Sequence, residues 1–598
     1  MRAPAISTTS SPAGCGWPSR FPITVKRRQG LQHPWLRRCS NGLRRRRVSS
    51  CSGTARTSIW RGRFEGMVLV AAPGSSHDDA DLLRHHRTVS ALVRRIQAGT
   101  DAATIDVQGP FTGEVIAALP ISNPVDVHAA AARARSAQVA WAARTISERI
   151  GVLLRFHDLL LDRRHEVLDL IQLETGKARR DANEEVLDVA LNIQHYARIA
   201  PRELRPRRPR GALPVLTRVR QWRHPVGVVG VIAPWNYPLT LAASDAVPGL
   251  IAGNAVIVKP DVQTSLTAAW VASLMAEAGL PDGLFQVVTG DGPVIGPAVI
   301  DAVDHVIFTG STATGRIVAD QCARRLIGCT LELGGKNAMI VRSDVEPAKA
   351  AAIATRAMFA NTGQLCISME RIYVHAAVFD AFVAELVDRV SALRIGTTPG
   401  WGADIGPLIN DSHLGRVQAH VDDAVARGAQ VLTGGRARPD IGPLAFEPTL
   451  LAGVTEEMTL CREETFGPVA AVYRVIDDDE AVWRANDSDY GLNASILSAD
   501  VRQARRLAVR MNAGSVNINE GYAATWGSVA APIGGRRDSG LGYRHGAEGL
   551  LATTESQVIA SQHVMGFAPP FGLDDARWGR ILSTAVGLMR PWRPTGRA

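Results

Sequence analysis

Apolar residues recur at every third and fourth position between about residues 123 and 200, which is the pattern of amphipathic helices. The pattern is clearest in Asp126–Val139 and Ile146–Leu161, and it predicts three helices in this region. A segment rich in Pro and Arg follows over residues 200–225. Its composition indicates an extended connection or a protruding hairpin.

The spacing of hydrophobic positions then changes, because short β-rich runs begin to alternate with helical patterns. The first series contains strands expected at Val226–Ile232, Ala255–Val258, Phe285–Val288 and Val306–Phe308. The second series runs from Ala338 to Ile518, with strands expected near Arg371–Val374, Ala470–Val475 and Ser515–Ile518. Such alternation is typical of a parallel sheet covered by helices. We therefore expect an α/β protein with two such domains.

Composition adds a basic N-terminal arm to an otherwise ordinary folded chain. Of the 598 residues, 46% are hydrophobic and 21% are charged, which excludes a chain that is disordered throughout. The net charge of +10 arises in residues 1–66, which hold fourteen Lys or Arg and one acid, so the remainder carries −3. We expect a disordered extension there, with Met67 as the true start, although the composition also fits a transit peptide. The near-neutral body argues against nucleic-acid binding.

The cysteines indicate a reduced, cytoplasmic setting. The chain has seven of them, an odd number, without a CxxC pair or a His at metal-ligand spacing, so we expect no metal site. No apolar run approaches the ~20 residues of a membrane span. In the tail, residues 561–598, the stretch 576–593 combines Trp, apolar residues and Arg. It fits either an interfacial helix with weak membrane contact or a helix packed on the body.

Two loops at predicted strand ends carry residues suited to a nucleotide. One turn places Gly310 and Ser311 between a strand and a helix, where backbone N–H groups can bind a phosphate. Lys259 directly follows another predicted strand, where open α/β sheets bind nucleotides. It is one of only five Lys among 67 basic residues, which favours a site that needs a compact ammonium. Taken singly, a Gly-Ser turn is usually only a turn, and a lone Lys is usually solvated.

Three further residues are suited to acyl chemistry. Cys366 ends a turn of small residues, and a cysteine nucleophile requires an activating neighbour and a base. Glu332, in the run ELGGK, supplies a carboxylate, and Asn236, after the first strand of the series, is a suitable oxyanion donor. An isolated Cys is more often inert packing, and an Asn at a strand end is equally often a turn residue.

The run from Glu463 to Pro468 contributes a carboxylate and an aromatic ring. Glu464 is able to accept hydrogen bonds from ribose hydroxyls, and Phe466 is able to pack on a flat ring. By itself such a pair is usually one surface residue and one core residue.

Together and in this order, the motifs resemble those of the aldehyde dehydrogenase superfamily over roughly residues 100–560. They are ETGK, PWN, KP, FTGS, ELGGK, GQxC and ExFGP, with 34 residues from Glu332 to Cys366. Over its whole length the chain looks most like actinobacterial NADP-dependent succinate-semialdehyde dehydrogenases. The resemblance implies a modified Rossmann cofactor domain over residues 100–331 and an α/β catalytic domain over 332–520. It also implies a bridging hairpin, from residues 205–225 and 541–560, that joins subunits into dimers or tetramers.

The resemblance also implies a mechanism. Cys366 attacks the aldehyde carbon while Asn236 and the Cys366 backbone N–H hold the oxyanion. After hydride passes to the nicotinamide, Glu332 activates the water that hydrolyses the thioester, so the product is a free acid. Family members that hand the acyl group to coenzyme A typically lack this Glu.

The resemblance assigns cofactor-binding positions to Trp235, Lys259, Gly310, Ser311, Leu333, Glu464 and Phe466. NAD-preferring members often hold a Glu three residues after the Lys of KP, where this chain has Val262. Because Val does not repel a 2′-phosphate, we expect NADP, with NAD as the other candidate.

The expected substrate is succinate semialdehyde, although the usual carboxylate-binding arginines are missing. Their positions hold Ala360 and Ser244 here, and Arg544 or Arg371 is a candidate to substitute for them, although no motif marks either one. The alternative is a channel for medium- or long-chain aliphatic aldehydes, or for a broad range of them, lined by Tyr237, Met358, Tyr522 and Trp526. A silent scaffold, or a nucleic-acid binder acting through the basic arm, is a remote alternative that the intact Cys366, Glu332 and Asn236 disfavour.

Overall fold

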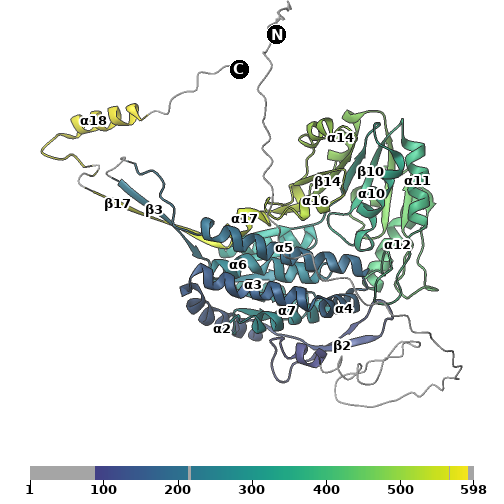
Figure 1. Cartoon of the computed structure of the whole chain (residues 1–598), viewed down its shortest axis with the longest axis horizontal. Coiled ribbons are helices and arrows are strands. Elements are labelled where there is room, and N and C mark those ends of the chain that lie inside the picture. The colour runs from purple at the N-terminus through teal and green to yellow at the C-terminus, as the bar shows by residue number, and fades with distance from the viewer. Residues whose placement is uncertain (1–87, 213–216, 564–565, 567, 590–598) are drawn as a thin grey trace, which may run out of the picture. The chain divides into compact units, whose positions relative to one another are not determined.

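Two mostly parallel sheets organise the part of the chain that the computed structural model describes, which comprises residues 88–212, 217–563, 566 and 568–589 (Figure 1). The expected extension over residues 1–66 and the expected start at Met67 lie outside these residues. Helices alternate with the strands of both sheets. The expected α/β class is therefore confirmed.

The first sheet has six strands in the order β16-β8-β7-β4-β5-β6, and all neighbours are parallel except β16 and β8. The strands are β4 (Val228–Ile232), β5 (Ala255–Lys259), β6 (Phe285–Val287), β7 (His305–Thr309), β8 (Gly328–Glu332) and β16 (Gly540–Leu541). Strands β4 to β7 match the sequence prediction to within two residues at each end. They are buried on both faces, and short continuous apolar runs are the pattern of such strands.

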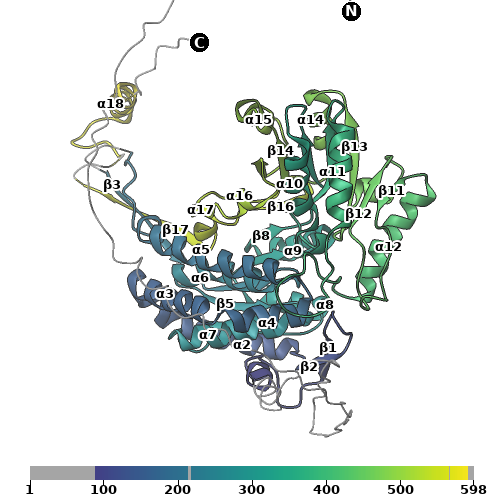
Figure 2. The ribbon, with the colours of Figure 1, turned by 45° about the vertical axis from the view of Figure 1, so that its right-hand side comes forward.

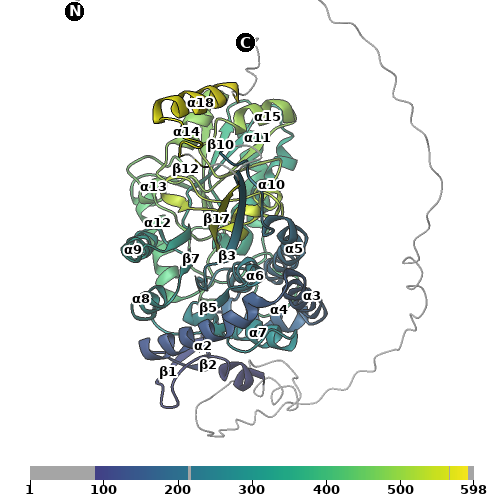
Figure 3. The same cartoon turned by 90° about the vertical axis from the view of Figure 1, so that its left-hand side faces the viewer.

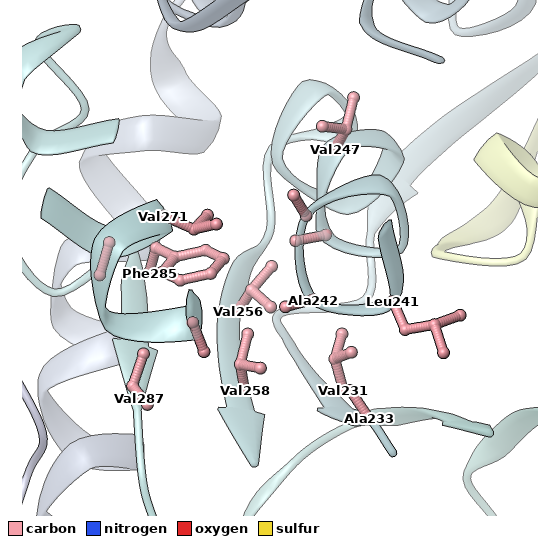
Figure 4. Packing of buried hydrophobic residues seen from close by; sticks show 14 of the residues in the cluster. Val231, Ala233, Leu241, Ala242, Val247, Val256, Val258, Val271, Phe285 and Val287 are labelled. Atoms are coloured by element: carbon pink, nitrogen blue, oxygen red, sulfur yellow. The ribbon is translucent and has the colours of Figure 1, made fainter. Parts of the chain in front are cut away.

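Helices cover both faces of this sheet (Figure 3). One face is covered by α2 (Pro124–Ala143) and α8 (Gly292–Ala302), with α9 (Thr312–Arg325) beside α8. The other is covered by the π-helical turn η1 (Thr240–Ser244), α6 (Ala246–Ala252) and α7 (Ser265–Glu277). Outside them lie α3 (Ile146–Asp162), α4 (Arg164–Thr175) and α5 (Arg179–Glu203). Figure 4 shows the core between the strands and η1, where Val231, Val256 and Val258 lie near Leu241 and Ala242.

The prediction of three helices between residues 123 and 200 was wrong, because the structure has four, α2 to α5. Arg163 alone separates α3 from α4, and neither Gly nor Pro stands at this break to mark it. The last helix also continues past Pro201 to Glu203, into the segment expected to be extended.

Two strands far apart in the sequence form a separate antiparallel ribbon (Figure 1). They are β3 (Thr217–Pro225) and β17 (Thr554–Gln562), paired over nine residues. Isolated bridges from Arg207 to Gln221 and from Arg210 to Arg218 extend the ribbon on the β3 side. All residues of β17 after Thr554 are exposed.

The second sheet has seven strands in the order β11-β12-β13-β10-β9-β14-β15, and only β11 and β12 are antiparallel neighbours (Figure 2). The strands are β9 (Asn337–Val341), β10 (Met369–His375), β11 (Gln430–Thr433), β12 (Thr449–Ala452), β13 (Val469–Val475), β14 (Asn493–Leu497) and β15 (Ser515–Ile518). Met339 and Val341 pack under α10 (Pro347–Phe359) and α11 (Phe379–Ser391). Ala338 and Ile340 face the opposite way, toward α14 (Asp478–Asn486) and α15 (Val501–Ala508).

The remaining elements are shorter or peripheral. They are the pair β1 (Thr104–Gln108) and β2 (Val115–Pro120), the helices α12 (Asp411–Ala426), α13 (Thr459–Arg462), α16 (Ala523–Trp526), α17 (Gly546–Leu551) and α18 (Asp575–Leu588), and the 3₁₀ turns η2 (Val262–Thr264), η3 (Ala360–Gly363) and η4 (Arg537–Ser539). In α18, Trp578 is buried while Ile581, Val586 and Leu588 are exposed. None of the helices in the described ranges has the length and apolar character needed to cross a membrane.

Candidate active site

A left-handed turn places Cys366 between α10 and β10. Asn361, Thr362 and Gly363 all have positive φ, and a Cβ on Gly363 would lie 2.0 Å from the Gly467 carbonyl oxygen. After the turn, the side-chain amide of Asn337 donates to the carbonyls of Cys366 and Ser368, both at 2.7 Å. Backbone contacts therefore fix the cysteine from both sides.

Asn236 lies in the turn after β4, next to the segment that carries the cysteine. Its Nδ2 donates to the Gln364 carbonyl at 3.2 Å, two residues before Cys366. Asn361 Nδ2 donates both to the Asn236 carbonyl, at 3.1 Å, and to the Gln364 carbonyl, at 2.9 Å. The expected oxyanion donor is thus hydrogen-bonded to the segment that carries the expected nucleophile, and both residues line the same small cavity.

Glu332 is the last residue of β8, and its side chain is buried with Oε1 lacking a hydrogen-bond partner within the described residues. Burial raises the pKa of this carboxyl to about 7, against the lowering effect of Arg544 and with a further rise from Asp245. A carboxyl with this pKa exchanges protons near neutral pH, as a general base must.

The surroundings of the Cys366 thiol disfavour its thiolate form. Burial is the main cause that raises its pKa to about 12, and the nearby carboxylates of Glu464 and Glu332 add to the rise. Arg544 opposes them. Because the thiolate is the nucleophile, this site requires a base to remove the thiol proton.

Two small cavities meet at Cys366. They share Cys366, Ile367, Trp526 and Arg544 as lining residues. The first is also lined by Glu184, Asn236, Tyr237, Thr240, Leu241, Leu365 and Tyr522. The second reaches Glu332 and is completed by Leu492, Ser515, Thr525, Ile533 and Gly534. The thiol therefore has a mostly apolar, aromatic space on one side and the expected base on the other.

Arg544 is the buried cation of this site. One of its terminal nitrogens donates to Asp245 at 2.8 Å and to the Thr309 hydroxyl at 2.7 Å, whereas Nε has no partner among the described residues. Arg371, the other suspected clamp, lies elsewhere. It donates to the backbone carbonyls of Lys336 and Ala485 and lines neither cavity, so a role beside Cys366 is excluded.

Three of the four residues expected to form an apolar channel do line the first cavity, namely Tyr237, Tyr522 and Trp526. Met358 does not, because it is 1% exposed and packs in the core between α10 and the second sheet. The sequence analysis missed Glu184, which lines the cavity, accepts from the Tyr522 hydroxyl at 3.0 Å and is paired with Arg356. The spacing of charged residues along α5 does not distinguish Glu184 from other acidic residues of this helix, such as Asp181, Glu185 and Asp188, which are buried.

The expected dinucleotide positions gather at the carboxyl ends of the first sheet. The Ser311 hydroxyl caps α9 by accepting from Thr314 N, so this helix N-terminus follows β7 directly. Lys259 ends β5 and is 5% exposed, and burial lowers the pKa of its ammonium. A Cβ on Gly315 would approach Leu333 Cδ2 to 2.4 Å, so the helix packs closely on Leu333. A phosphate-binding helix end and a buried cation at one sheet edge fit a dinucleotide.

An aromatic and acidic group joins the turn after β4 to the segment before β13. The rings of Trp235 and Phe466 meet edge to face, with centroids 5.6 Å apart, and Phe466 has φ of 57°. Glu464 Oε1 accepts from Gly335 N at 2.9 Å, and burial raises the pKa of this carboxyl to about 8. These residues bring together both sides of the expected nicotinamide site. In the described part of the chain, no three His, Cys, Asp or Glu side chains are grouped so that they could hold a metal ion.

Comparisons with known proteins agree with this arrangement. The family model described as "Aldehyde dehydrogenase family" matches residues 96–559. A Mycolicibacterium smegmatis protein named "Putative succinate-semialdehyde dehydrogenase [NADP(+)]" is 48% identical over 480 residues, which cover 80% of this chain and 93% of the relative. A Methylomonas protein named "4,4'-diapolycopene aldehyde oxidase" is 39% identical over 75% of this chain and 84% of its own length. The crystal structure of succinate-semialdehyde dehydrogenase from Burkholderia pseudomallei matches with a TM-score of 0.75 and 34% identity, covering 78% of this chain and 96% of that one.

Proposed function

This chain belongs to the aldehyde dehydrogenase family, and we propose that it oxidises succinate semialdehyde to succinate with NADP. Membership of the family makes the chain an aldehyde dehydrogenase that uses NAD or NADP. The observation that supports succinate semialdehyde as the substrate is Arg544. This buried guanidinium lies in the wall of the cavity that holds Cys366, and its Nε has no partner among the described residues. A guanidinium fork binds a carboxylate with two parallel hydrogen bonds. The name of the Mycolicibacterium smegmatis relative supports the same substrate.

The acylation half of the reaction belongs to Cys366 and Asn236. A water molecule takes the thiol proton, and the thiolate bonds the aldehyde carbon. The Asn236 amide and the Cys366 backbone N–H donate to the resulting oxyanion. The nicotinamide dinucleotide, when bound, supplies the hydride acceptor. Loss of hydride from the carbon leaves a thioester on Cys366.

Glu332 carries the deacylation half. Its carboxylate takes a proton from a water molecule, which attacks the thioester and releases succinate and the free thiol. Glu332 lines the second cavity together with Cys366, so a water molecule held there would lie between the carboxylate and the thioester.

The proposed cofactor preference depends on η2. Val262 begins this turn three residues after Lys259, and the Asp261 carboxylate is occupied by Gln263 N at 2.9 Å. The Val262 side chain presents no ionised acceptor for two ribose hydroxyls. Lys259 and Ser311 would hold the adenosine side, and Glu464, Phe466 and Trp235 the nicotinamide side.

A second substrate class has its own support. Tyr237, Tyr522 and Trp526 give the first cavity an aromatic wall, and the Methylomonas relative is named for a long apolar aldehyde. An aliphatic aldehyde is therefore the competing candidate.

Self-association is proposed from the exposed ribbon. The open edge of β17, with Val558 and Ile559 both exposed, is suited to pairing with another copy of the chain.

Trapping the acyl group tests substrate and mechanism together. The Glu332→Gln full-length protein is incubated with NADP and equimolar succinate semialdehyde and hexanal, and the Cys366 peptide is analysed by mass spectrometry. We expect mostly the succinyl thioester. A mostly hexanoyl thioester would transfer the proposal to the aliphatic candidate, and acylation of another residue would overturn the assigned nucleophile.

A further inference from the structure

Lys177 is a fully enclosed lysine whose ammonium contacts the backbone of the Asn236 turn. It has 0% exposure and lies between α4 and α5. Its Nζ donates to Glu185 Oε1 at 2.6 Å and to the Asn236 carbonyl at 2.5 Å. The same nitrogen lies 4.0 Å from the centre of the Tyr237 ring. The ammonium is thus surrounded by a carboxylate, the carbonyl of Asn236 and the ring of the next residue.

Glu185 holds the following stretch of the same turn. Its Oε2 accepts from the backbone N–H groups of Leu239, at 2.9 Å, and Thr240, at 3.2 Å. The Lys177–Glu185 pair therefore forms hydrogen bonds to the backbone at both ends of the turn over residues 236–240. The carboxylate and ammonium leave little freedom for the peptide that carries the Asn236 side chain.

Asn361 connects the Asn236 carbonyl to the segment that carries Cys366. The Asn236 carbonyl that receives Lys177 also receives Asn361 Nδ2, which in turn donates to the Gln364 carbonyl. The Asn236 amide donates to that same Gln364 carbonyl. A shift of the Asn236 peptide would therefore change the position of the amide relative to Cys366.

A buried ion pair is a poor way to gain stability alone. Removing two charges from water costs several kcal/mol for each ion, and apolar replacements are often neutral or stabilising. The chain also uses Lys for only five of its 67 basic residues, so a Lys at a fully enclosed position is an exception. A compact ammonium with three donors fits this enclosure, whereas a planar guanidinium would not.

We propose that Lys177 is a positioning residue for the oxyanion site: its ammonium, paired with Glu185, fixes the Asn236 peptide so that the Asn236 amide points at the oxygen of the Cys366 adduct. The inference rests on the proposed role of Asn236 and not on the identity of the aldehyde. It assigns the Lys of the ETGK motif a part in acylation, without contact to substrate or cofactor.

The chain offers a matched control on the other side of the site. Lys336 is 2% exposed and pairs with Glu370, which accepts from the backbone N–H groups of Thr465 and Phe466. This second pair holds the segment that carries Glu464 and Phe466. The two pairs have the same chemistry and the same burial, but they hold different parts of the site.

The test compares Lys177→Met with Lys336→Met in the full-length protein. The rate of the first turnover is measured in stopped flow with the aldehyde that the wild type oxidises fastest, and the cofactor Kd is measured by fluorescence. We expect Lys177→Met to slow the first turnover by on the order of 100-fold, as loss of one oxyanion donor does, with an unchanged Kd. Lys336→Met is expected to raise the cofactor Kd instead. An unchanged first turnover in folded Lys177→Met would overturn the proposal.

A double-mutant cycle separates positioning from general loss of stability. If Lys177 acts through Asn236, adding Lys177→Met to Asn236→Ala produces little further loss in the first turnover. Multiplicative losses would contradict the proposal.

If Lys177→Met does not fold, Glu185→Gln replaces it in the cycle. The amide keeps an acceptor for Leu239 but removes the charge, and the same non-additivity with Asn236→Ala is expected. If Asn236→Ala leaves the first turnover unchanged, Asn236 is not the oxyanion donor and the proposal is refuted, whereas a wrong aldehyde alone leaves all these ratios intact.

Discussion

Burial and Glu464 raise the pKa of the Cys366 thiol, in the turn that enters one sheet, and the Glu332 carboxylate, at the end of a strand in the other sheet, adds to this rise. Cys366 and Glu332 line one small cavity. The surroundings disfavour the thiolate, and burial raises the pKa of the carboxyl to about 7. An ionised Glu332 therefore disfavours the thiolate, which fits the proposed role of this carboxylate in the later step, activation of water.

Removing the base should separate the two halves of the reaction. Glu332→Gln is expected to retard deacylation most, so a burst of reduced cofactor close to one per active site precedes a steady rate lowered by a factor of 100 or more, on the order of general-base effects. Stopped-flow absorbance of the reduced nicotinamide measures both phases. Wild-type steady turnover in this variant would show that another group activates water.

The reactivity of Cys366 toward iodoacetamide should depend on its acidic neighbours. The alkylation rate is expected to be slow at pH 7 and to rise with pH up to the alkaline limit of the fold, because burial keeps the thiol protonated. Glu464→Gln should accelerate alkylation at pH 8, since Glu464 is the carboxylate that raises the pKa of the thiol most. Peptide mapping against Cys366→Ser identifies the modified residue. Equal rates in wild type and Glu464→Gln would contradict the assigned electrostatics.

Burial of Glu332 should make the fold less stable as pH rises. The carboxyl has a pKa of about 7 in the folded protein against an ordinary value of 4.5, so its ionised form is disfavoured by folding. The resulting destabilisation is absent below pH 4.5, grows between pH 4.5 and 7, and reaches about 3 kcal/mol above that range. Glu332→Gln should therefore raise Tm at pH 8 more than at pH 5, measured by scanning calorimetry. A gain that is independent of pH would mean that this carboxyl titrates normally.

Arg544 should determine selectivity between charged and apolar aldehydes. Arg544→Met is expected to lower kcat/KM for succinate semialdehyde relative to hexanal by about 100-fold, equal to about 3 kcal/mol. Asp245→Asn is the control, because it weakens the ion pair at 2.8 Å but keeps the guanidinium. The ratio of the two kcat/KM values should survive in Asp245→Asn. If Arg544→Met lowered both substrates equally, the arginine would serve the structure and not the substrate carboxylate.

Local patterns in the sequence predicted the strands that position the site, since β4, β5, β7 and β15 are short runs with clear boundaries. The boundary between α3 and α4 was missed because Arg163 interrupts the helix without a helix-breaking residue. Motifs predicted Cys366, Glu332 and Asn236, but not the pairing of Arg544 with Asp245. That pair spans 299 residues, and only the fold brings the two side chains together.

The most direct test of the proposed function is kcat/KM of the full-length wild-type protein for succinate semialdehyde and for hexanal, each with NADP and with NAD. We expect kcat/KM for succinate semialdehyde with NADP to exceed kcat/KM for each other combination by at least tenfold. A higher value for hexanal with either cofactor would contradict it, and the aromatic wall of Tyr237, Tyr522 and Trp526 would then determine the substrate.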